Sequence, residues 1–333
     1  MHKLIVIGAS AGGVNALTSV TSALPANFRA TVLIVMHIGA RPSKLPEILQ
    51  KVCPLPVRHA EDGAPLLPGH VLIAPPDRHL TVERDDGVPK ARLWHGPKEN
   101  FTRPAIDPLF RSAAAAFDGH VIAAILTGYL DDGTAGLYAV KTCGGAAIVQ
   151  DPNDAQVPDM PANALNHVAV DHVLPLREIG PMLAALANRP QSPPEHNVAT
   201  GDKPVPPTWL TVENRFVRGA AGVEELQRFG TASGYTCPEC NGALWKISDA
   251  VPPRFRCHTG HSFTARALAE LQDQSVEAAL WASLRALQEQ ARLEQEMLQD
   301  ALIRHDRTAE RHHRARVHKL QADVKTLHAL LSA

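Results

Sequence analysis

The sequence predicts an α/β fold with a doubly wound, mostly parallel sheet, followed by a small cysteine-bearing unit and a long C-terminal helix or helical hairpin. Three patterns support this prediction: short apolar runs alternating with helical stretches up to about residue 187, paired cysteine motifs near residue 240, and leucines at helical spacing beyond residue 263. Strands that alternate with helices form parallel sheets that helices cover on both faces. The length of 333 residues fits roughly two domains.

Five short runs in the first half of the chain have the composition of buried strands. Each is rich in Val and Ile and is bounded by Gly, Pro or Asp. The helices expected between them cover 13–23, 105–117 and 134–143, and the more polar residues 79–95 fit a strand pair with its turn at 85–87. The runs are KLIVIGA, ATVLIVMH, HVLIAPP, HVIAAILTG and GGAAIVQD.

The second half of the chain is organised differently. Residues 188–207 contain six prolines and few large apolar residues, which is typical of an extended linker. We therefore expect a main domain over 1–187, this linker, a cysteine unit over 208–262 and a helical tail over 263–333. Two stretches of the tail repeat apolar residues at helical spacing but are out of register. One long helix with a register break, a helical hairpin and a single amphipathic helix all fit this spacing.

Composition excludes several classes of protein. Lys and Arg number 33 against 34 Asp and Glu, so nucleic acid, which clustered cations bind, is disfavoured as a partner. The basic segment 304–319 has a net charge of only +4 because its histidines are mostly neutral at pH 7. No apolar run reaches the roughly 20 residues of a membrane span, and the N-terminus lacks the pattern of a secretory signal. We therefore expect a cytoplasmic protein without membrane insertion.

A serine lies at the first predicted strand-to-helix turn. Gly8 to Gly12 read G-A-S-A-G, which fits the G-x-S-x-G turn that exposes a nucleophilic serine, here Ser10, at a helix N-terminus. A dinucleotide-binding turn needs glycine where Ser10 stands, and the G-K-[ST] of a phosphate loop is absent. A plain turn with a capping serine remains the alternative.

Two further strand ends carry the other groups that acyl transfer requires. His37 ends the second predicted strand, and Asp131 and Asp132 follow the strand HVIAAILTG. The carboxyl ends of parallel strands meet at one edge of the sheet, where ligands bind. A base there can activate the serine, and a buried carboxylate can orient the base. The order Ser, His, Asp differs from that of the common α/β hydrolases.

These residues lie in longer motifs that resemble the CheB-type chemotaxis protein-glutamate methylesterases. The resemblance covers about residues 3–180 and rests on VIGASAGGVNAL, AEDGAPLLPGHVLIAPPDRHL, RPAIDPLF and ILTGYLDDGTAG, together with His37. The stretch EDG…LLPGHVLIAPPDRH is far more specific than a short glycine motif.

The resemblance implies a role for individual residues. Ser10 corresponds to the nucleophile, His37 to the base and Asp132, which immediately precedes the glycine of DG, to the orienting acid. The backbone N–H groups of His37 and Tyr129 correspond to the oxyanion donors, although Tyr129-Leu130 departs from the usual Met-Gly. Arg103, in the family's RP stretch, corresponds to a substrate contact.

The implied reaction is hydrolysis of glutamate γ-methyl esters on the cytoplasmic helices of chemoreceptors, with release of methanol and no catalytic cofactor. Some members of the family also deamidate glutamine. Familiar members carry an N-terminal phosphoacceptor domain, whereas here the esterase pattern starts at Met1. We therefore expect regulation to be absent, to be moved to the C-terminal region, or to be supplied in trans by a receiver-domain protein; a methyltransferase is another partner in trans. The alternative function is a regulatory scaffold that uses a degenerate esterase fold, the cysteine unit and a coiled coil.

The cysteine unit has the spacing of a metal site. Cys237 and Cys240 form a C-x-x-C pair, and Cys257 follows 17 residues later with His258 and His261 as candidate fourth ligands. Adjacent Cys257 and His258 can hardly bind one ion without strain, so His261 is the better fourth ligand. Three thiolates and one imidazole suit a closed structural zinc site. A redox-active or incidental C-x-x-C is the alternative.

Overall fold

The computed structural model describes residues 2–189 and 207–332. It divides into two compact units, Met1–Leu268 and Ala269–Ala333, which are described separately below. Most of the predicted Pro-rich linker, residues 190–206, lies outside the described residues.

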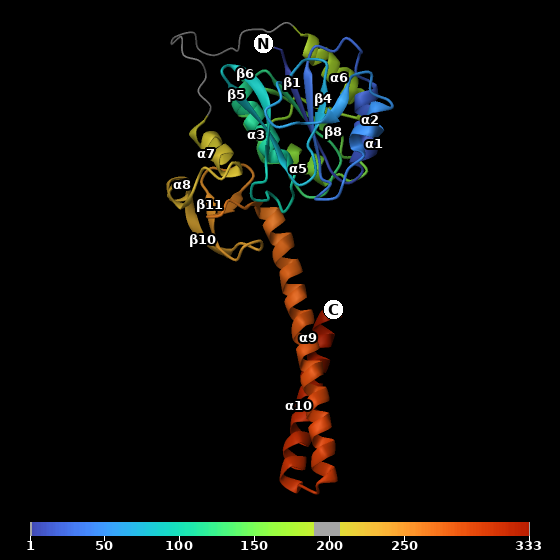
Figure 1. The fold of residues 1–333 in the computed structure, drawn as a ribbon, viewed down its shortest axis with the longest axis vertical. Coiled ribbons are helices and arrows are strands. Elements are labelled where there is room, and N and C mark those ends of the chain that lie inside the picture. The colour runs from blue at the N-terminus through green and yellow to red at the C-terminus, as the bar shows by residue number, and fades with distance from the viewer. Residues whose placement is uncertain (1, 190–206, 333) are drawn as a thin grey trace. The chain divides into compact units, whose positions relative to one another are not determined.

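The first unit is built on a seven-stranded sheet (Figure 1). The spatial order is β3-β4-β2-β1-β7-β8-β9, and every neighbouring pair is parallel. The chain moves to one side of β1 through β2 and to the other side through β7, so the sheet is doubly wound, as predicted. The strands are β1 (Leu4–Ala9), β2 (Thr31–Met36), β3 (Val57–His59), β4 (Val71–Ile73), β7 (Val121–Ile125), β8 (Ala146–Gln150) and β9 (His172–Leu174).

Helices cover both faces of this sheet. Side chains of β1 alternate between the faces, with Ile5 and Ile7 in one apolar core and Leu4 and Val6 in the other. The first core also contains side chains of α1 (Gly13–Ser22), α2 (Leu45–Gln50) and α6 (Leu176–Asn188). The second contains side chains of α3 (Ile106–Phe117), α4 (Thr134–Thr142) and α5 (Asp159–His167).

The predicted strand pair is an antiparallel hairpin of β5 (His79–Asp85) and β6 (Val88–Trp94). Asp86 and Gly87 form its two-residue turn, with φ of 49° and 78°. Asp-Gly favours such a turn because both central residues need positive φ. Leu80 and Val82 of β5 belong to the same apolar core as α3, so the hairpin extends that layer.

The cysteine unit forms a small antiparallel sheet within the same compact unit. Its strands are β10 (Gly230–Thr236), β11 (Ala243–Ile247), β12 (Arg254–Cys257) and β13 (Ser262–Thr264), in that order. The helices α7 (Thr208–Val217) and α8 (Val223–Phe229) precede them, and Phe216, Leu226 and Ile247 form a small apolar cluster there. A cluster of this size supplies little stability on its own.

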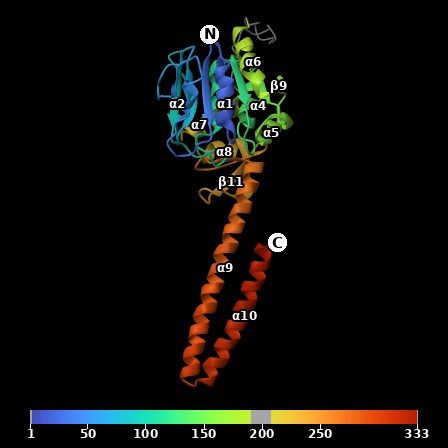
Figure 2. The ribbon, with the colours of Figure 1, turned by 90° about the vertical axis from the view of Figure 1, so that its right-hand side faces the viewer.

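The second unit is a helical hairpin, one of the three alternatives that the sequence left open. It contains most of α9 (Ala265–Ile303) and all of α10 (Arg307–Leu331), which run side by side in Figure 2. Asp306 begins α10 as its N-cap by accepting hydrogen bonds from the Thr308 and Ala309 N–H groups. Among the described residues, no helix is both long and apolar enough to cross a bilayer.

Candidate active site and metal centre

The carboxyl ends of β1 and β2 bring Ser10 and His37 together. Ala9 pairs with Met36 in the sheet, and Ser10 and His37 are the residues that follow. Ser10 Oγ lies 3.1 Å from His37 Nδ1. The parallel register therefore places a hydroxyl beside an imidazole, as the two strand ends predict.

Glycines allow neighbouring backbone segments to lie close to Ser10. Gly12, the N-cap of α1, has a φ of 78°, which only glycine adopts without strain. A Cβ on Gly128, in the loop after β7, would lie 2.7 Å from the Ser10 Cβ and 2.2 Å from the Met160 sulfur. A larger residue at position 128 would push the loop away from the serine.

Asp132 completes a chain of three side chains. Its Oδ2 lies 2.8 Å from His37 Nε2, and the Asp132 side chain is 3% exposed. An ionised carboxylate only accepts hydrogen bonds, so the imidazole proton lies on Nε2. Nδ1 is then the acceptor for the Ser10 hydroxyl, which is the arrangement a general base needs.

Backbone and side-chain N–H groups hold the Asp132 carboxylate in its ionised form. The N–H groups of Ile106 and Asp107, in the first turn of α3, donate at 2.6 Å and 3.3 Å, and Asn100 Nδ2 donates at 3.0 Å. Burial alone would raise the pKa of Asp132, but the bonds from His37, Ile106 and Asn100 outweigh it and hold this pKa below its usual range.

The neighbouring Asp131 has different partners. Thr264 Oγ1 of β13 donates to Asp131 at 2.7 Å, and no other described residue donates to this carboxylate. Burial raises the pKa of Asp131 to about 6, against the opposing effect of the Thr264 hydrogen bond. Of the two aspartates, only Asp132 lies within hydrogen-bond distance of His37 in the described part of the chain, and its role as the orienting acid stays a prediction.

The two backbone N–H groups predicted to donate to the oxyanion differ in whether they already make a hydrogen bond within the protein. The Tyr129 N–H makes no hydrogen bond within the described part of the chain, so it can donate to a ligand. The His37 N–H instead donates to the Ala9 carbonyl at 3.2 Å. A role for the His37 N–H would require this contact to be shared or broken, and both assignments stay predictions.

Arg103 is held by protein groups. Its guanidinium donates to Asp77 Oδ1 and the Gly96 carbonyl and lies 2.8 Å from His95 Nε2. These contacts fix the loop before α3. Contact with substrate stays a prediction for this residue.

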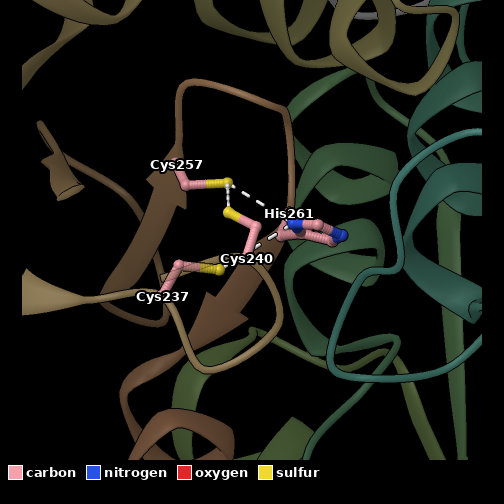
Figure 3. A group of neighbouring side chains, drawn as sticks. All are labelled: Cys237, Cys240, Cys257 and His261. Atoms are coloured by element: carbon pink, nitrogen blue, oxygen red, sulfur yellow. Dashed lines mark hydrogen bonds between the residues drawn. The ribbon is translucent and has the colours of Figure 1, made fainter. Parts of the chain in front are cut away.

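The four predicted metal ligands gather in one place (Figure 3). The Sγ atoms of Cys237, Cys240 and Cys257 and a ring nitrogen of His261 all lie within 4.8 Å of one another. The Cys240 and Cys257 sulfurs are 3.7 Å apart, and His261 Nδ1 lies 3.5 Å from the Cys257 sulfur. Tetrahedral zinc with bonds of about 2.3 Å to sulfur and 2.0–2.1 Å to nitrogen requires separations of about 3.8 Å and 3.5 Å. The four side chains therefore fit a zinc ion.

Polar residues that the sequence did not single out join the cysteine unit to the sheet. Glu99 accepts from Arg111 Nη2 of α3 at 2.8 Å and from Arg256 Nη2 of β12 at 3.1 Å. Glu213 of α7 pairs with Arg256 and with Arg254, and all five side chains are at most 4% exposed. No sequence pattern signals this cluster, nor the contact of Asn100 with Asp132, because the partners come from distant segments.

Together, the doubly wound sheet and the hydrogen-bonded Ser10, His37 and Asp132 have the arrangement of a serine hydrolase. Residues 5–183 match the sequence model of the family described as CheB methylesterase. This match covers more than half of the chain, and the chain belongs to the CheB methylesterase family.

Individual relatives agree with this membership. A protein of Leptospira interrogans is 39% identical over 186 residues, which make up 56% of this chain and 95% of that protein. The protein-glutamate methylesterase/protein-glutamine glutaminase of Azospirillum brasilense is 39% identical over 188 residues, but these are 48% of its length. The crystal structure of the Thermotoga maritima CheB methylesterase catalytic domain is similar over 56% of this chain and 99% of that one, with a TM-score of 0.55 and 36% identity.

Proposed function

We propose that this protein hydrolyses the γ-methyl esters of glutamates on the cytoplasmic helices of chemoreceptors and releases methanol. The observation that carries the proposal is the chain of contacts from Ser10 Oγ to His37 Nδ1 at 3.1 Å and from His37 Nε2 to Asp132 at 2.8 Å. Family membership supplies the substrate class. Because the three groups are intact and in contact, they favour an enzyme over a degenerate scaffold.

The reaction proceeds in two steps. Ser10 Oγ attacks the ester carbonyl while His37 Nδ1 takes its proton, and the protonated imidazole then gives that proton to the leaving methoxide. Water next attacks the acyl-enzyme with His37 again as the base, which restores Ser10 and leaves a free glutamate. Asp132 stabilises the imidazolium in both steps. This chemistry needs no cofactor, and a glutamine amide would react by the same route with release of ammonia.

The deciding experiment measures methanol and ammonia released from methylated and amidated receptor fragments. The full chain is compared with the Ser10→Ala variant on both substrates. Methanol release that requires Ser10 supports the proposal. Equal release by the two proteins, or none from the wild type on any methylated receptor, contradicts it.

We further propose that Cys237, Cys240, Cys257 and His261 hold a structural zinc ion. The separations among these atoms support this, as does the lack of a carboxylate ligand, which suits a closed site. The Thr259 hydroxyl lies 2.9 Å from the Cys257 sulfur and can donate to it as a thiolate. Elemental analysis of protein purified without chelator tests this, with about one zinc per chain expected and less than a tenth of that contradicting it.

The remaining proposals concern location and partners. We propose a cytoplasmic enzyme that meets receptor helices there, with a methyltransferase or a receiver-domain protein acting in trans. The near-neutral charge still disfavours nucleic acid as a partner, because binding to phosphates needs an excess of cations. Absence of salt-sensitive DNA retention is the expected result.

A further inference from the structure

Strand β13 of the cysteine unit pairs with a loop that leads into the candidate active site. The Asn100 N–H donates to the Ser262 carbonyl at 2.7 Å, and the Ser262 N–H donates to the Lys98 carbonyl at 3.3 Å. Ser262 directly follows His261, one of the four proposed zinc ligands. The residue that hydrogen-bonds to this loop is therefore the direct chain neighbour of a proposed metal ligand.

The Asn100 side chain extends the connection to Asp132. Asn100 Oδ1 accepts from the Thr264 N–H of β13 at 3.0 Å, and Nδ2 donates to Asp132 Oδ1 at 3.0 Å. The side chain is buried, and the residue has a φ of 47°, a conformation that asparagine tolerates better than most residues. Nδ2 also donates to Asp107 Oδ2 at 3.3 Å, so a single amide connects the cysteine unit, through Oδ1, with Asp107 and with the carboxylate next to His37, through Nδ2.

A second contact fixes the same loop from the neighbouring residue. Glu99 lies between Arg111 of α3 and Arg256 of β12, and Arg256 precedes the ligand Cys257. Arg256 Nη1 also donates to the Gly260 carbonyl, next to His261. The loop is therefore held by both β12, which ends at the proposed ligand Cys257, and β13, which begins directly after the proposed ligand His261.

We propose that Asn100 is a positioning residue for Asp132, and that the cysteine unit with its bound metal keeps Asn100 in place. This inference rests on the proposed esterase function. The cysteine unit is then part of the catalytic apparatus, because removing the metal loosens the β12–β13 turn and with it the Asn100 amide. Among the described residues, Asn100 makes no hydrogen bond to Ser10 or His37, and it is only 5% exposed.

Loss of the Asn100 contact should affect turnover rather than substrate binding. Asp132 would lose one of the N–H donors that stabilise its charge and fix its orientation toward His37. A hydrogen bond to a charged group of this kind corresponds to about a 10–100-fold change in rate. Because Asn100 is almost fully buried, we expect it not to contact the receptor helix, so KM should stay within about twofold.

The first test compares steady-state kinetics of the full chain with Asn100→Gly and Thr102→Val on a methylated receptor fragment. Glycine removes both polar atoms and accepts the positive φ, so backbone strain does not confuse the result. Thr102 is the matched control, since within the described residues its hydroxyl donates only to the Glu99 carbonyl in the same loop. We expect a 10–100-fold lower kcat for Asn100→Gly and wild-type kcat for Thr102→Val. Wild-type kcat for Asn100→Gly, or equal losses in both variants, overturns the proposal.

The second test does not depend on activity. Amide hydrogen exchange is followed in the zinc-loaded full chain and after removal of zinc by a chelator, with metal content measured in both samples. The Ile106 and Asp107 N–H groups, which donate to Asp132, should lose at least tenfold in protection when zinc leaves. Amides of β4, at the far side of the sheet, should keep theirs. Unchanged exchange at 106 and 107 after zinc is lost, or failure of the chain to bind zinc, overturns the metal dependence.

The two tests separate the two proposals. If the wild type releases no methanol, the proposed esterase function fails, while the exchange experiment still decides whether the metal cluster stabilises the surroundings of Asp132. If the wild type is active and Asn100→Gly matches it, the positioning role fails and the esterase function stands.

Discussion

Two histidine–carboxylate pairs of nearly equal length occur in separate regions of this molecule. His37 Nε2 lies 2.8 Å from Asp132 at the sheet edge, and His313 Nδ1 lies 2.7 Å from Glu294 in the helical hairpin. Both imidazoles are equally exposed, at 14% of the side chain. Distance and exposure of the histidine therefore do not distinguish a candidate catalytic pair from a structural one.

The surroundings of each pair make the difference. The second nitrogen of His37 faces a serine hydroxyl, and Asp132 accepts three further N–H groups. Glu294 has one more partner, Arg316, whose side chain is 49% exposed. The first pair is fixed by four segments far apart in the sequence, and the second by two neighbouring helices. A catalytic assignment thus depends on the nucleophile and on the groups that hold the acid.

The largest expected effect comes from removing the nucleophile. Ser10→Ala should lower kcat for methyl-ester hydrolysis by about 10⁴-fold or more, because the intact His37–Asp132 pair has no oxygen to activate. The unfolding temperature should stay within about 2 °C of the wild type, since one half-buried hydroxyl is lost. Methanol release and thermal unfolding measure the two quantities. Activity of Ser10→Ala within tenfold of the wild type would contradict a catalytic role for the His37–Asp132 pair and leave it indistinguishable from the His313–Glu294 pair.

The next effect concerns the buried charges that hold the loop beside Asp132. Two arginines, Arg111 and Arg256, hold the pKa of Glu99 at about 2 against the opposing effect of burial. Glu99→Gln leaves both guanidiniums without this carboxylate and should lower the free energy of unfolding by about 3–5 kcal/mol at pH 7. The contribution of Glu99 is present above pH 4.5 and is lost as the pH falls toward 2, so the difference between the two proteins should shrink in acid.

A matched variant checks that charge balance is the cause. Arg256→Met removes one of three arginines and leaves Arg111 with Glu99 and Arg254 with Glu213. This variant should lose less stability than Glu99→Gln in urea unfolding at pH 7. The opposite order would show that packing of Arg256, rather than compensation of Glu99, dominates the cluster.

The sequence predicted those parts of the fold whose signals are local. The five apolar runs are strands β1, β2, β4, β7 and β8, and the three expected helices are α1, α3 and α4. The strands β3 and β9 have three residues each and carry no distinct periodicity, so they were missed, as were α2, α5 and α6. For the tail, apolar spacing alone could not choose the hairpin, because helical repeats are the same in a straight and in a folded pair.

The same division applies to the site. Strand-end residues such as His37 can be recognised because parallel strands end at a common edge, and the four Cys/His positions because their spacing is local. Asn100 and Thr264 could not be found in this way. Their contact joins positions 164 residues apart, and it depends on a loop conformation that no single-sequence pattern encodes.

A smaller effect is expected at Asp131, the buried neighbour of Asp132 that does not contact His37. Burial raises the pKa of Asp131 from about 3.8 to about 6, so the folded state binds this proton more tightly than the unfolded state. Stability is therefore lost as the pH rises from about 4 to 6, by up to about 3 kcal/mol. Asp131→Asn removes this cost while keeping an oxygen for the Thr264 hydroxyl.

The Asp131→Asn variant should accordingly be more stable than the wild type at pH 8 and equally stable near pH 4, as measured by urea unfolding at both values. A stability difference that does not change with pH would mean that Asp131 titrates normally. The methylesterase activity of the variant at pH 8 should stay within a few-fold of the wild type, because Asp131 does not contact His37.

The smallest effect is expected at the hairpin pair. Glu294→Gln removes the carboxylate charge that pairs with His313 and Arg316 but leaves an amide oxygen that can accept a hydrogen bond from either residue. Among the described residues, no nucleophile lies beside His313. The variant should therefore match the wild type in kcat and KM for methyl-ester hydrolysis. Asp132→Asn is the matched change at the sheet edge and should reduce kcat by about 10⁴-fold, because the amide no longer fixes the imidazole proton on Nε2. Similar losses in both variants would mean that the hairpin pair also serves catalysis, and that the groups around Asp132 are not what separates the two.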